Sequence, residues 1–317
     1  MIGYRYLLTV LAWSTFVCSE VRGPFTKHFS NWLHNNNYDS YNFEDEKFGD
    51  QGSFGGKQHD FVSVQNTPVV FIHGNSDGAL ADGKPMGTGW TSSITYFMTK
   101  GYTSAELFSF TWGKDRNLGN AGSRTHDCDT LVRLRKFIDA VMQYTNKTQI
   151  NIISHSMGVT LGRGLIRGQI CNLGKSIEDK INVFIGIAGG CYGLCACSGA
   201  ASNIYPSCGK DTGFFPGNSC GNNLGTCELK TQPVDCCHAS IKYSSYLTRL
   251  NNFDYPEATK TYSFWSLADD IIENGDLVWT YSTSKMPHSE VKIFQNYTHM
   301  ETKDQTVDIQ YSLINPN

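Results

Sequence analysis

The sequence predicts an α/β fold with a mostly parallel central sheet and helices on both faces. Two features of the chain support this prediction. Short apolar or β-branched runs without polar alternation recur along the chain, as is typical of strands that are covered on both faces. Segments with the periodicity of a helix lie between the early runs. Strands that alternate with helices favour a parallel sheet joined by right-handed crossovers.

The predicted elements begin at residue 68. The predicted strands are residues 68–73, 106–112, 149–154, 181–189, 261–266 and 291–294. The predicted helices are residues 90–100, 131–144 and 157–167. One face of the second helix carries Leu131, Leu134, Phe137 and Ile138. The sequence contains no repeat and no Pro-rich or Ser-rich linker, so residues 20–317 are expected to form one domain.

Composition and charge exclude several classes of protein. The 317 residues are 40% hydrophobic and 17% charged, which is ordinary for a folded chain and excludes dominant disorder. The 26 basic and 29 acidic side chains nearly cancel without forming long runs, so no nucleic-acid partner is expected. The mean hydropathy is −0.32 and the only long apolar run opens the chain, so no transmembrane segment is expected in the mature protein.

The first residues predict secretion. Arg5 precedes an apolar stretch from Leu7 to Val17, and small residues follow it. This is the pattern of a secretory signal peptide, here residues 1–19. As a helix the stretch would cover only about 16 Å, which is too short to cross a bilayer. The mature protein is therefore expected to be extracellular, and its sequons at Asn146 and Asn296 are candidate glycan acceptors.

The cysteines agree with an oxidising compartment. Ten remain after residue 19, eight of them between positions 191 and 237. Their even number predicts five disulfides, whose pairing the sequence leaves open. The alternative is a zinc site built from Cys195, Cys197, Cys236 and His238.

The most specific local feature is the pentapeptide Ser154-His155-Ser156-Met157-Gly158. It lies directly after a predicted strand and directly before a predicted helix, which is the context of a nucleophile elbow. Such a turn requires small residues two positions before and two positions after the serine, because the strand and the helix crowd together there. Gly158 satisfies this requirement fully and Ser154 less well. Ser156 is therefore the candidate nucleophile, and a plain turn is the alternative.

A nucleophilic serine needs a base, and the base needs an acid that orients it. In the order typical of hydrolases both follow the serine along the chain, and here both follow predicted strands that end on the same rim of the sheet. Asp269 is the candidate acid, with Asp270 as the second choice, and His299 is the candidate base. His238 and His288 do not follow such a strand end. This chemistry needs no metal and no organic cofactor.

A candidate oxyanion hole joins two segments of the chain. The strand at residues 68–73 leads into a His-Gly turn beside the first crossover, where the second oxyanion donor of such enzymes is found. The backbone amides of Asn75 and Met157 are the candidate pair. His73 ends the strand and is expected to be structural, because a histidine in that position usually bonds locally.

The chain resembles the class 2 lipases, which are secreted α/β-hydrolases. The resemblance rests on segments in unbroken order, namely NTPVVFIHGN, SITYFMTKGY, ELFSFTWG, INIISHSMGV, INVFIGIAGG, YSFWSLADDII and NYTHM. It implies an α/β-hydrolase fold, a triad of Ser156, Asp269 and His299, and an oxyanion hole at Asn75 and Met157. About seventy residues with eight cysteines separate INVFIGIAGG from YSFWSLADDII, so substrate access does not follow from the resemblance.

Two segments depart from the alternating pattern. Residues 20–66 are polar and rich in Asn, Gly and Phe, and are expected to form an extended N-terminal segment that wraps the core. Residues 191–255 are expected to form a disulfide-rich insertion, either a cover over the cleft or an outer loop that only protects against proteolysis. In a cover, the candidate lipid-facing side chains are Tyr192, Leu194, Phe214 and Phe215.

The expected function is that of a secreted carboxylic-ester hydrolase that acts on acylglycerols or related lipid esters and makes transient contact with a lipid surface. Two alternatives stay open. The first is a non-catalytic secreted protein that binds lipids or other partners on a hydrolase scaffold. The second is a thioesterase or peptidase, because the triad determines acyl transfer but not the leaving group.

Overall fold

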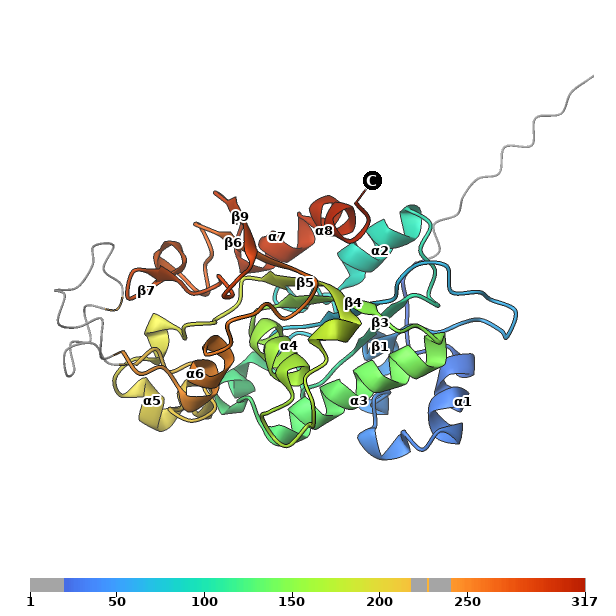
Figure 1. Ribbon diagram of the computed structural model, residues 1–317, viewed down its shortest axis with the longest axis horizontal. Coiled ribbons are helices and arrows are strands. Elements are labelled where there is room, and N and C mark those ends of the chain that lie inside the picture. The colour runs from blue at the N-terminus through green and yellow to red at the C-terminus, as the bar shows by residue number, and fades with distance from the viewer. Residues whose placement is uncertain (1–19, 218–226, 228–240, 317) are drawn as a thin grey trace, which may run out of the picture.

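The central sheet is mostly parallel, as predicted. The computed structural model describes residues 20–217, 227 and 241–316, so the predicted signal peptide lies outside them (Figure 1). In the described part the strand order is β1-β3-β2-β4-β5-β6-β9, with β1 antiparallel to β3 and all other neighbours parallel. The strands of this sheet are β1 (Ser53–Phe54), β2 (Val69–Ile72), β3 (Leu107–Phe110), β4 (Ile150–His155), β5 (Ile181–Ile187), β6 (Lys260–Ser266) and β9 (Glu290–Phe294). A separate hairpin consists of β7 (Leu277–Val278) and β8 (Tyr281–Ser282).

Helices cover both faces of the sheet, which confirms the predicted layers (Figure 1). One face carries α1 (Lys27–Asn35), α3 (Cys128–Thr145), α4 (Met157–Arg167) and α6 (Ser245–Asn251), and the other carries α2 (Thr91–Thr99), α7 (His299–Asp304) and α8 (Val307–Ile314). The Cys-rich segment contains α5 (Ala201–Ile204). Short 3-10 helices are η1 (Asp39–Tyr41), η2 (Glu46–Gln51), η3 (Leu118–Ser123), η4 (Glu178–Lys180), η5 (Cys195–Cys197), η6 (Pro206–Cys208) and η8 (Asn274–Asp276). Among the described helices, none has the length and apolar character needed to span a bilayer.

Two segments have features that their sequence patterns did not indicate. Residues 20–66 contain α1 and β1, and the buried rings of Phe25 and Phe29 pack against Phe137 of α3. The edge strand β9 pairs with β6, and its Val291 and Ile293 are 40% and 49% exposed. The run Val291–Phe294 therefore predicted the strand correctly but not its exposure, although Lys292 within it is a residue typical of exposed edge strands.

Disulfides connect distant parts of the chain. Those among the described residues are Cys128–Cys171, Cys195–Cys227 and Cys197–Cys208. The prediction that all ten cysteines pair is wrong for Cys191, which is buried with a free thiol. The residues outside the described part include Cys220, Cys236, Cys237 and His238. Because Cys195 and Cys197 are oxidised, neither can supply a thiolate to the alternative zinc site.

Helix α4 is buried along its whole length, although it contains two arginines. Glu257 neutralises both: its Oε1 accepts a hydrogen bond from Arg163 Nε at 2.7 Å and lies 3.1 Å from Arg167 Nη2. The guanidinium group of Arg167 also lies over the ring of Phe253, with its Cζ atom 4.4 Å from the ring centroid. Removing one partner of a buried ion pair leaves an uncompensated charge, so Glu257 holds this helix against the sheet.

Replacement of Glu257 by Gln is expected to lower the free energy of unfolding by about 3–5 kcal/mol, because two buried guanidinium groups lose their counter-charge. Asp139→Asn is the matched control. Its carboxylate pairs with Arg135 and Lys136 on the partly exposed side of α3 and should contribute less than about 1 kcal/mol. Urea unfolding followed by circular dichroism measures both variants, and equal losses would contradict the role given to Glu257.

Candidate active site

Ser156 lies on the bend between β4 and α4. Its φ and ψ are 54° and −128°, a conformation that L residues rarely adopt, and its N–H donates to Ile187 O at 2.8 Å. A Cβ atom at Gly158 would overlap the carbonyl oxygens of Ile72 and His73. The close approach of α4 to the end of β2 therefore requires glycine, and the bend places Ser156 at the carboxyl edge of the sheet.

Ser154 occupies the position at which the elbow favours a smaller residue. Its side chain is fully buried, and its hydroxyl donates to Ile185 O of β5 at 3.2 Å. Gly186 is the residue opposite Ser154 in the register of β4 and β5. The hydroxyl group is thus satisfied inside the sheet, and the bend at Ser156 forms without glycine at this position.

Asp269 and His299 are hydrogen-bonded to each other. His299 is the first residue of α7, and its Nδ1–H donates to Asp269 Oδ2 at 2.7 Å. The other carboxylate oxygen accepts the backbone amides of Ile271 and Ile272 at 2.9 and 2.8 Å. Burial acts to raise the pKa of Asp269, but the His299 side chain and the two amides outweigh it and hold that pKa below its ordinary value.

The second candidate acid has a different contact. Asp270 Oδ1 accepts the backbone N–H of His299 at 2.9 Å, and within the described part of the chain it makes no hydrogen bond to the imidazole. The two neighbouring carboxylates therefore hold different parts of the same histidine. Asp269 is placed to orient the ring, and Asp270 is placed to fix the start of α7.

His155 is a residue of the site that the sequence reasoning did not assign. It is buried, its Nε2–H donates to His299 O at 3.2 Å, and the centroids of the two rings lie 4.5 Å apart. Burial holds its pKa well below the ordinary value, so the ring is neutral. Its position directly before Ser156 is the one sequence signal that could have drawn attention to it.

Arg124 supports the loop that carries Asn75. Its Nη1 donates to Asn75 Oδ1 at 2.9 Å and to Ser76 Oγ at 2.5 Å, and its Nη2 pairs with Asp115 at 2.5 Å. Asn75 Nδ2 in turn donates to Ala121 O at 2.9 Å. Both polar atoms of the Asn75 side chain are thus hydrogen-bonded. No sequence pattern indicates this arginine, because its contacts are 48 and 49 residues away along the chain.

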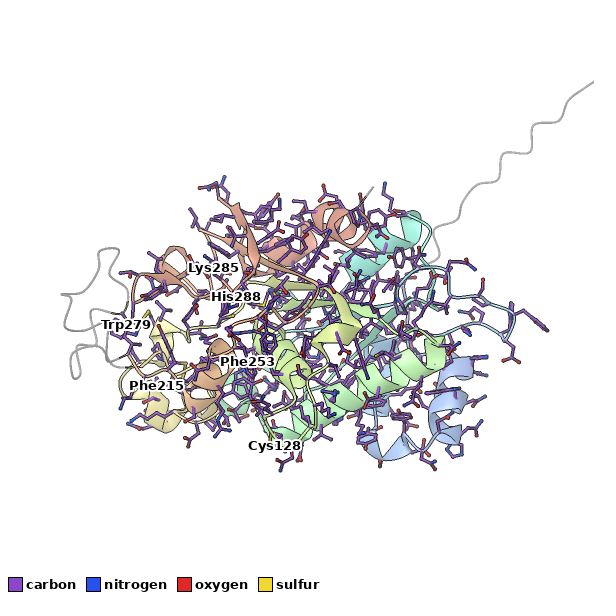
Figure 2. All side chains as sticks on the ribbon, in the orientation of Figure 1. Cys128, Phe215, Phe253, Trp279, Lys285 and His288 are labelled. Carbon is purple, nitrogen blue, oxygen red and sulfur yellow. A yellow bond between two sulfur atoms is a disulfide. The ribbon has the colours of Figure 1, made fainter. Side chains whose placement is uncertain are left out.

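Two further histidines considered from the sequence, His73 and His288, have structural contacts. His73 Nδ1–H donates to Gly74 O at 2.7 Å, its Nε2 accepts Trp112 N–H at 3.1 Å, and burial lowers its pKa to about 3. It is a neutral residue of the strand end, as expected. His288 is exposed and donates from Nε2 to Phe253 O at 3.3 Å (Figure 2).

A cavity of about 280 Å³ opens at the carboxyl edge of the sheet. Ser156, His299, Asn75 and Met157 all line it. Most of its other walls are apolar, with contributions from Leu118, Leu194, Phe214, Ile271, Ile272 and Met300. Across residues 20–217, 227 and 241–316, no group of three or more His, Cys, Asp or Glu side chains is placed to hold a metal ion.

The arrangement contains the groups required for acyl transfer. A carboxylate at Nδ1 leaves the Nε2 atom of His299 free to accept a proton, and a serine hydroxyl in the same cavity is the usual donor. Met157 is the first residue of α4, so its amide has no acceptor within the helix and lies at the positive end of the helix dipole. Such an amide can stabilise negative charge that develops in the cavity.

Several solved structures are similar to the chain at low sequence identity. Lipase BlEst2 of Bacillus licheniformis is 12% identical, with a TM-score of 0.49 over 83% of this chain and 97% of that one. The monoacylglycerol lipase of Paleococcus ferrophilus is 14% identical, with a TM-score of 0.44 over 83% and 97%. Lipase B of Aspergillus fumigatus is 10% identical, with a TM-score of 0.46 over 80% and 52%, so this chain spans about half its length. No match is found among curated proteins.

The family model described as lipase (class 2) matches residues 66–312, which is most of the chain. The matched range begins just before β2, includes the bend at Ser156 and the Asp269–His299 pair, and ends within α8. The parallel sheet and the strand-to-helix bend agree with an α/β-hydrolase fold. The chain therefore belongs to the class 2 lipase family.

Proposed function

We propose that the protein is a carboxylic-ester hydrolase that acts on acylglycerols or related lipid esters, with Ser156 as nucleophile, His299 as base and Asp269 as orienting acid. The observation that carries this proposal is the 2.7 Å bond between His299 and Asp269 beside a cavity that both His299 and Ser156 line. The family supports an ester as the substrate, and the apolar walls of the cavity favour a lipid ester.

The reaction proceeds in two halves. Ser156 Oγ attacks the ester carbonyl carbon while His299 Nε2 accepts its proton, and the carbonyl oxygen becomes an oxyanion that accepts the amides of Asn75 and Met157. The tetrahedral intermediate collapses, the bond to the alcohol oxygen breaks, and His299 donates its proton to that oxygen. Water then attacks the carbonyl carbon of the acyl-serine and gives a proton to His299. The bond between that carbon and Ser156 Oγ breaks, His299 returns the proton to Oγ, and the carboxylic acid leaves.

Asp269 keeps His299 in the required tautomer. Because its pKa lies below the ordinary value, the carboxylate stays ionised at neutral pH and accepts the Nδ1 proton throughout the cycle. Its charge also stabilises the imidazolium that forms when Ser156 loses its proton. The backbone amides of Ile271 and Ile272 donate hydrogen bonds that fix the carboxylate, so it cannot rotate away from the imidazole ring.

The protein is proposed to work outside the cell. Its disulfides and the predicted signal peptide both favour an oxidising compartment. The sequon residues Asn146 and Asn296 are exposed, so both are proposed as glycan acceptors. Although Asn296 lies three residues before His299, the histidine is buried and the asparagine is not, so a glycan would extend from the surface.

Contact with a lipid surface has a candidate location. Leu118 and Ile271 line the cavity and are 54% and 46% exposed, so the cavity presents apolar side chains to the surface, here called its mouth. Exposed apolar side chains at the entrance to a site are typical of surfaces that meet lipid or another partner. We include transient binding to a lipid surface at this mouth in the proposed function.

Replacement of Ser156 by Ala is expected to lower kcat for ester hydrolysis by about 10⁶-fold, because the triad acts as a unit. It should also abolish labelling by a fluorophosphonate probe, which reacts with activated serines. Ser154→Ala is the control, since this serine is buried in β4 and does not line the cavity. A wild-type protein that neither reacts with the probe nor hydrolyses esters would instead favour the non-catalytic lipid-binding alternative.

The two neighbouring carboxylates give a second test. Asp269→Asn should lower kcat by about 10⁴-fold, because the amide favours the wrong tautomer of His299. Asp270→Asn retains an oxygen that accepts the backbone N–H of His299, so its loss should stay below about tenfold. Steady-state kinetics on one soluble ester compare the two variants. A larger loss for Asp270→Asn would assign the acid role to Asp270.

A further inference from the structure

The Cys-rich segment contributes one side of the cavity beside Ser156. Of its four candidate lipid-facing side chains, Leu194 and Phe214 line the cavity, whereas Tyr192 and Phe215 do not. At about 280 Å³ the cavity lies at the small end of the range for ligand pockets, roughly 300–1,000 Å³. The small volume makes the identity of this wall important for which substrates fit.

The direction of the acyl chain follows from the proposed mechanism. In the tetrahedral intermediate the oxyanion faces the amides of Asn75 and Met157, and the leaving oxygen faces His299 because it receives the proton. The acyl chain must therefore extend away from both. His299 begins α7 on one face of the sheet, whereas Phe214 belongs to the hydrophobic cluster on the opposite face. The acyl chain needs an apolar part of the cavity, and the Cys-rich segment supplies one through Leu194 and Phe214.

Phe214 has little room to move. It is 6% exposed, and its ring contacts the ring of His126 edge-on at 4.8 Å. On another side it lies against Gly190, where a Cβ atom would be 2.8 Å from Phe214 Cε1. Gly190 follows β5, the strand whose last residue accepts the N–H of Ser156. Phe214 therefore stands next to the strand end that supports the nucleophile.

Backbone bonds and disulfides fix this wall. Phe214 N–H donates to Ser207 O at 2.7 Å, and Leu194 N–H donates to Phe214 O at 3.0 Å. The disulfide Cys197–Cys208 links the two flanks of the same segment. In a densely bonded segment of this kind, a side chain cannot swing away to admit a longer substrate without breaking several contacts.

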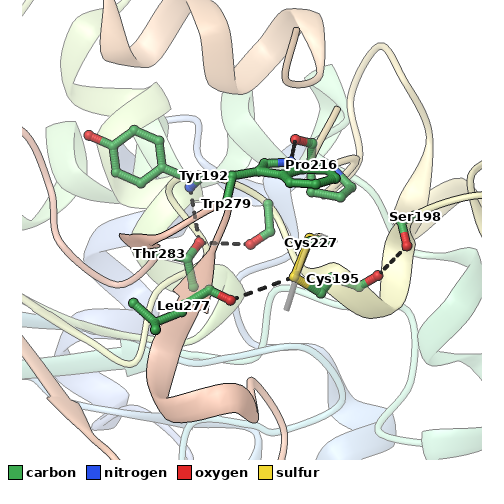
Figure 3. Close-up of a disulfide and its surroundings, with 9 residues drawn as sticks. Tyr192, Cys195, Ser198, Pro216, Cys227, Leu277, Trp279 and Thr283 are labelled. Atoms are coloured by element: carbon green, nitrogen blue, oxygen red, sulfur yellow. Dashed lines mark hydrogen bonds between the residues drawn. A yellow bond between two sulfur atoms is a disulfide. The ribbon is translucent and has the colours of Figure 1, made fainter. Parts of the chain in front are cut away.

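The segment is also anchored to the loop after β6 (Figure 3). Trp279 Nε1 donates to Pro216 O at 2.8 Å, and Thr283 Oγ1 donates to Gly193 O at 2.7 Å while accepting Tyr192 N–H at 3.1 Å. Trp279 and Phe215 lie at the same end of the molecule (Figure 2). These contacts connect the residues on both sides of the wall to the β7–β8 hairpin, which fixes the position of the wall.

We propose that Phe214, together with Leu194, forms the end wall of the acyl subsite and restricts efficient hydrolysis to short acyl chains. The inference rests on the proposed function, because it needs Ser156 and His299 in their assigned roles. It names these two residues as determinants of specificity. The part of the Cys-rich segment around them is then a fixed wall of the site.

The test compares kcat/KM for p-nitrophenyl acetate, butyrate, octanoate and palmitate. The wild-type enzyme should prefer butyrate to octanoate by about tenfold or more, and Phe214→Ala should raise the octanoate-to-butyrate ratio by about tenfold or more, because the truncated side chain opens the wall. Phe215→Ala is the matched control. This neighbour has the same 6% exposure but does not line the cavity, so its ratio should remain that of the wild type.

Leu194→Ala is a second variant, in case the first does not fold, and fluorophosphonate labelling reports an intact site in each protein. The inference would be overturned if Phe214→Ala reacts with the fluorophosphonate but keeps the octanoate-to-butyrate ratio of the wild type. If Phe214→Ala does not react, the same result for Leu194→Ala would overturn it. So would a wild-type enzyme that hydrolyses palmitate as efficiently as butyrate. A wild-type protein that is not labelled and hydrolyses none of the esters would overturn the proposed function itself, and the inference with it.

Discussion

The strained bend at Ser156 is the constraint on which the rest of the site depends. A positive φ at a residue other than glycine costs about 1–3 kcal/mol and persists only where the surroundings enforce it. Here the enforcement comes from both sides: the N–H of Ser156 bonds to the end of β5, and α4 is buried along its whole length. Gly158 lets the helix approach β2 closely enough to hold this geometry. The position of the serine hydroxyl therefore depends on how α4 packs against the sheet.

Charged groups in the interior follow a consistent rule. Glu257 lies against two buried arginines, and Asp269 lies against His299 and two amides that hold its pKa below the ordinary value. Asp276, in the same connection after β6, shows the opposite case: it accepts a hydrogen bond from Ser284, no cation of the described residues pairs with it, and burial raises its pKa to about 8. Surroundings, more than residue type, decide which buried carboxyl carries charge.

The sequence was most informative where the signal is local. The continuous apolar runs predicted β2, β4, β5 and β6, and the Ser154–Gly158 pattern predicted the start of α4, because burial and turn geometry depend on near neighbours. The sequence ranked Asp269 ahead of Asp270 but gave no contact that separates them, since both follow β6 and their different bonds to His299 depend on the fold. Arg124 and the disulfide partners were equally out of reach, because their contacts join residues far apart in the chain. Two-residue strand β1 has no apolar run to detect.

The Cys-rich segment illustrates how one fold can separate reaction chemistry from substrate choice. In parallel sheets the connections at the carboxyl ends of strands border the site, so a long insertion after β5 necessarily reaches the cavity. The groups proposed to do chemistry lie on the loop after β2, at the start of α4, on the loop after β6 and on α7, and none comes from the insertion. Leu194 and Phe214 nevertheless enter the same cavity. If this wall selects the substrate as proposed, the Cys197–Cys208 disulfide and the bond from Trp279 to Pro216 serve specificity as well as stability, because they keep the shape of the wall.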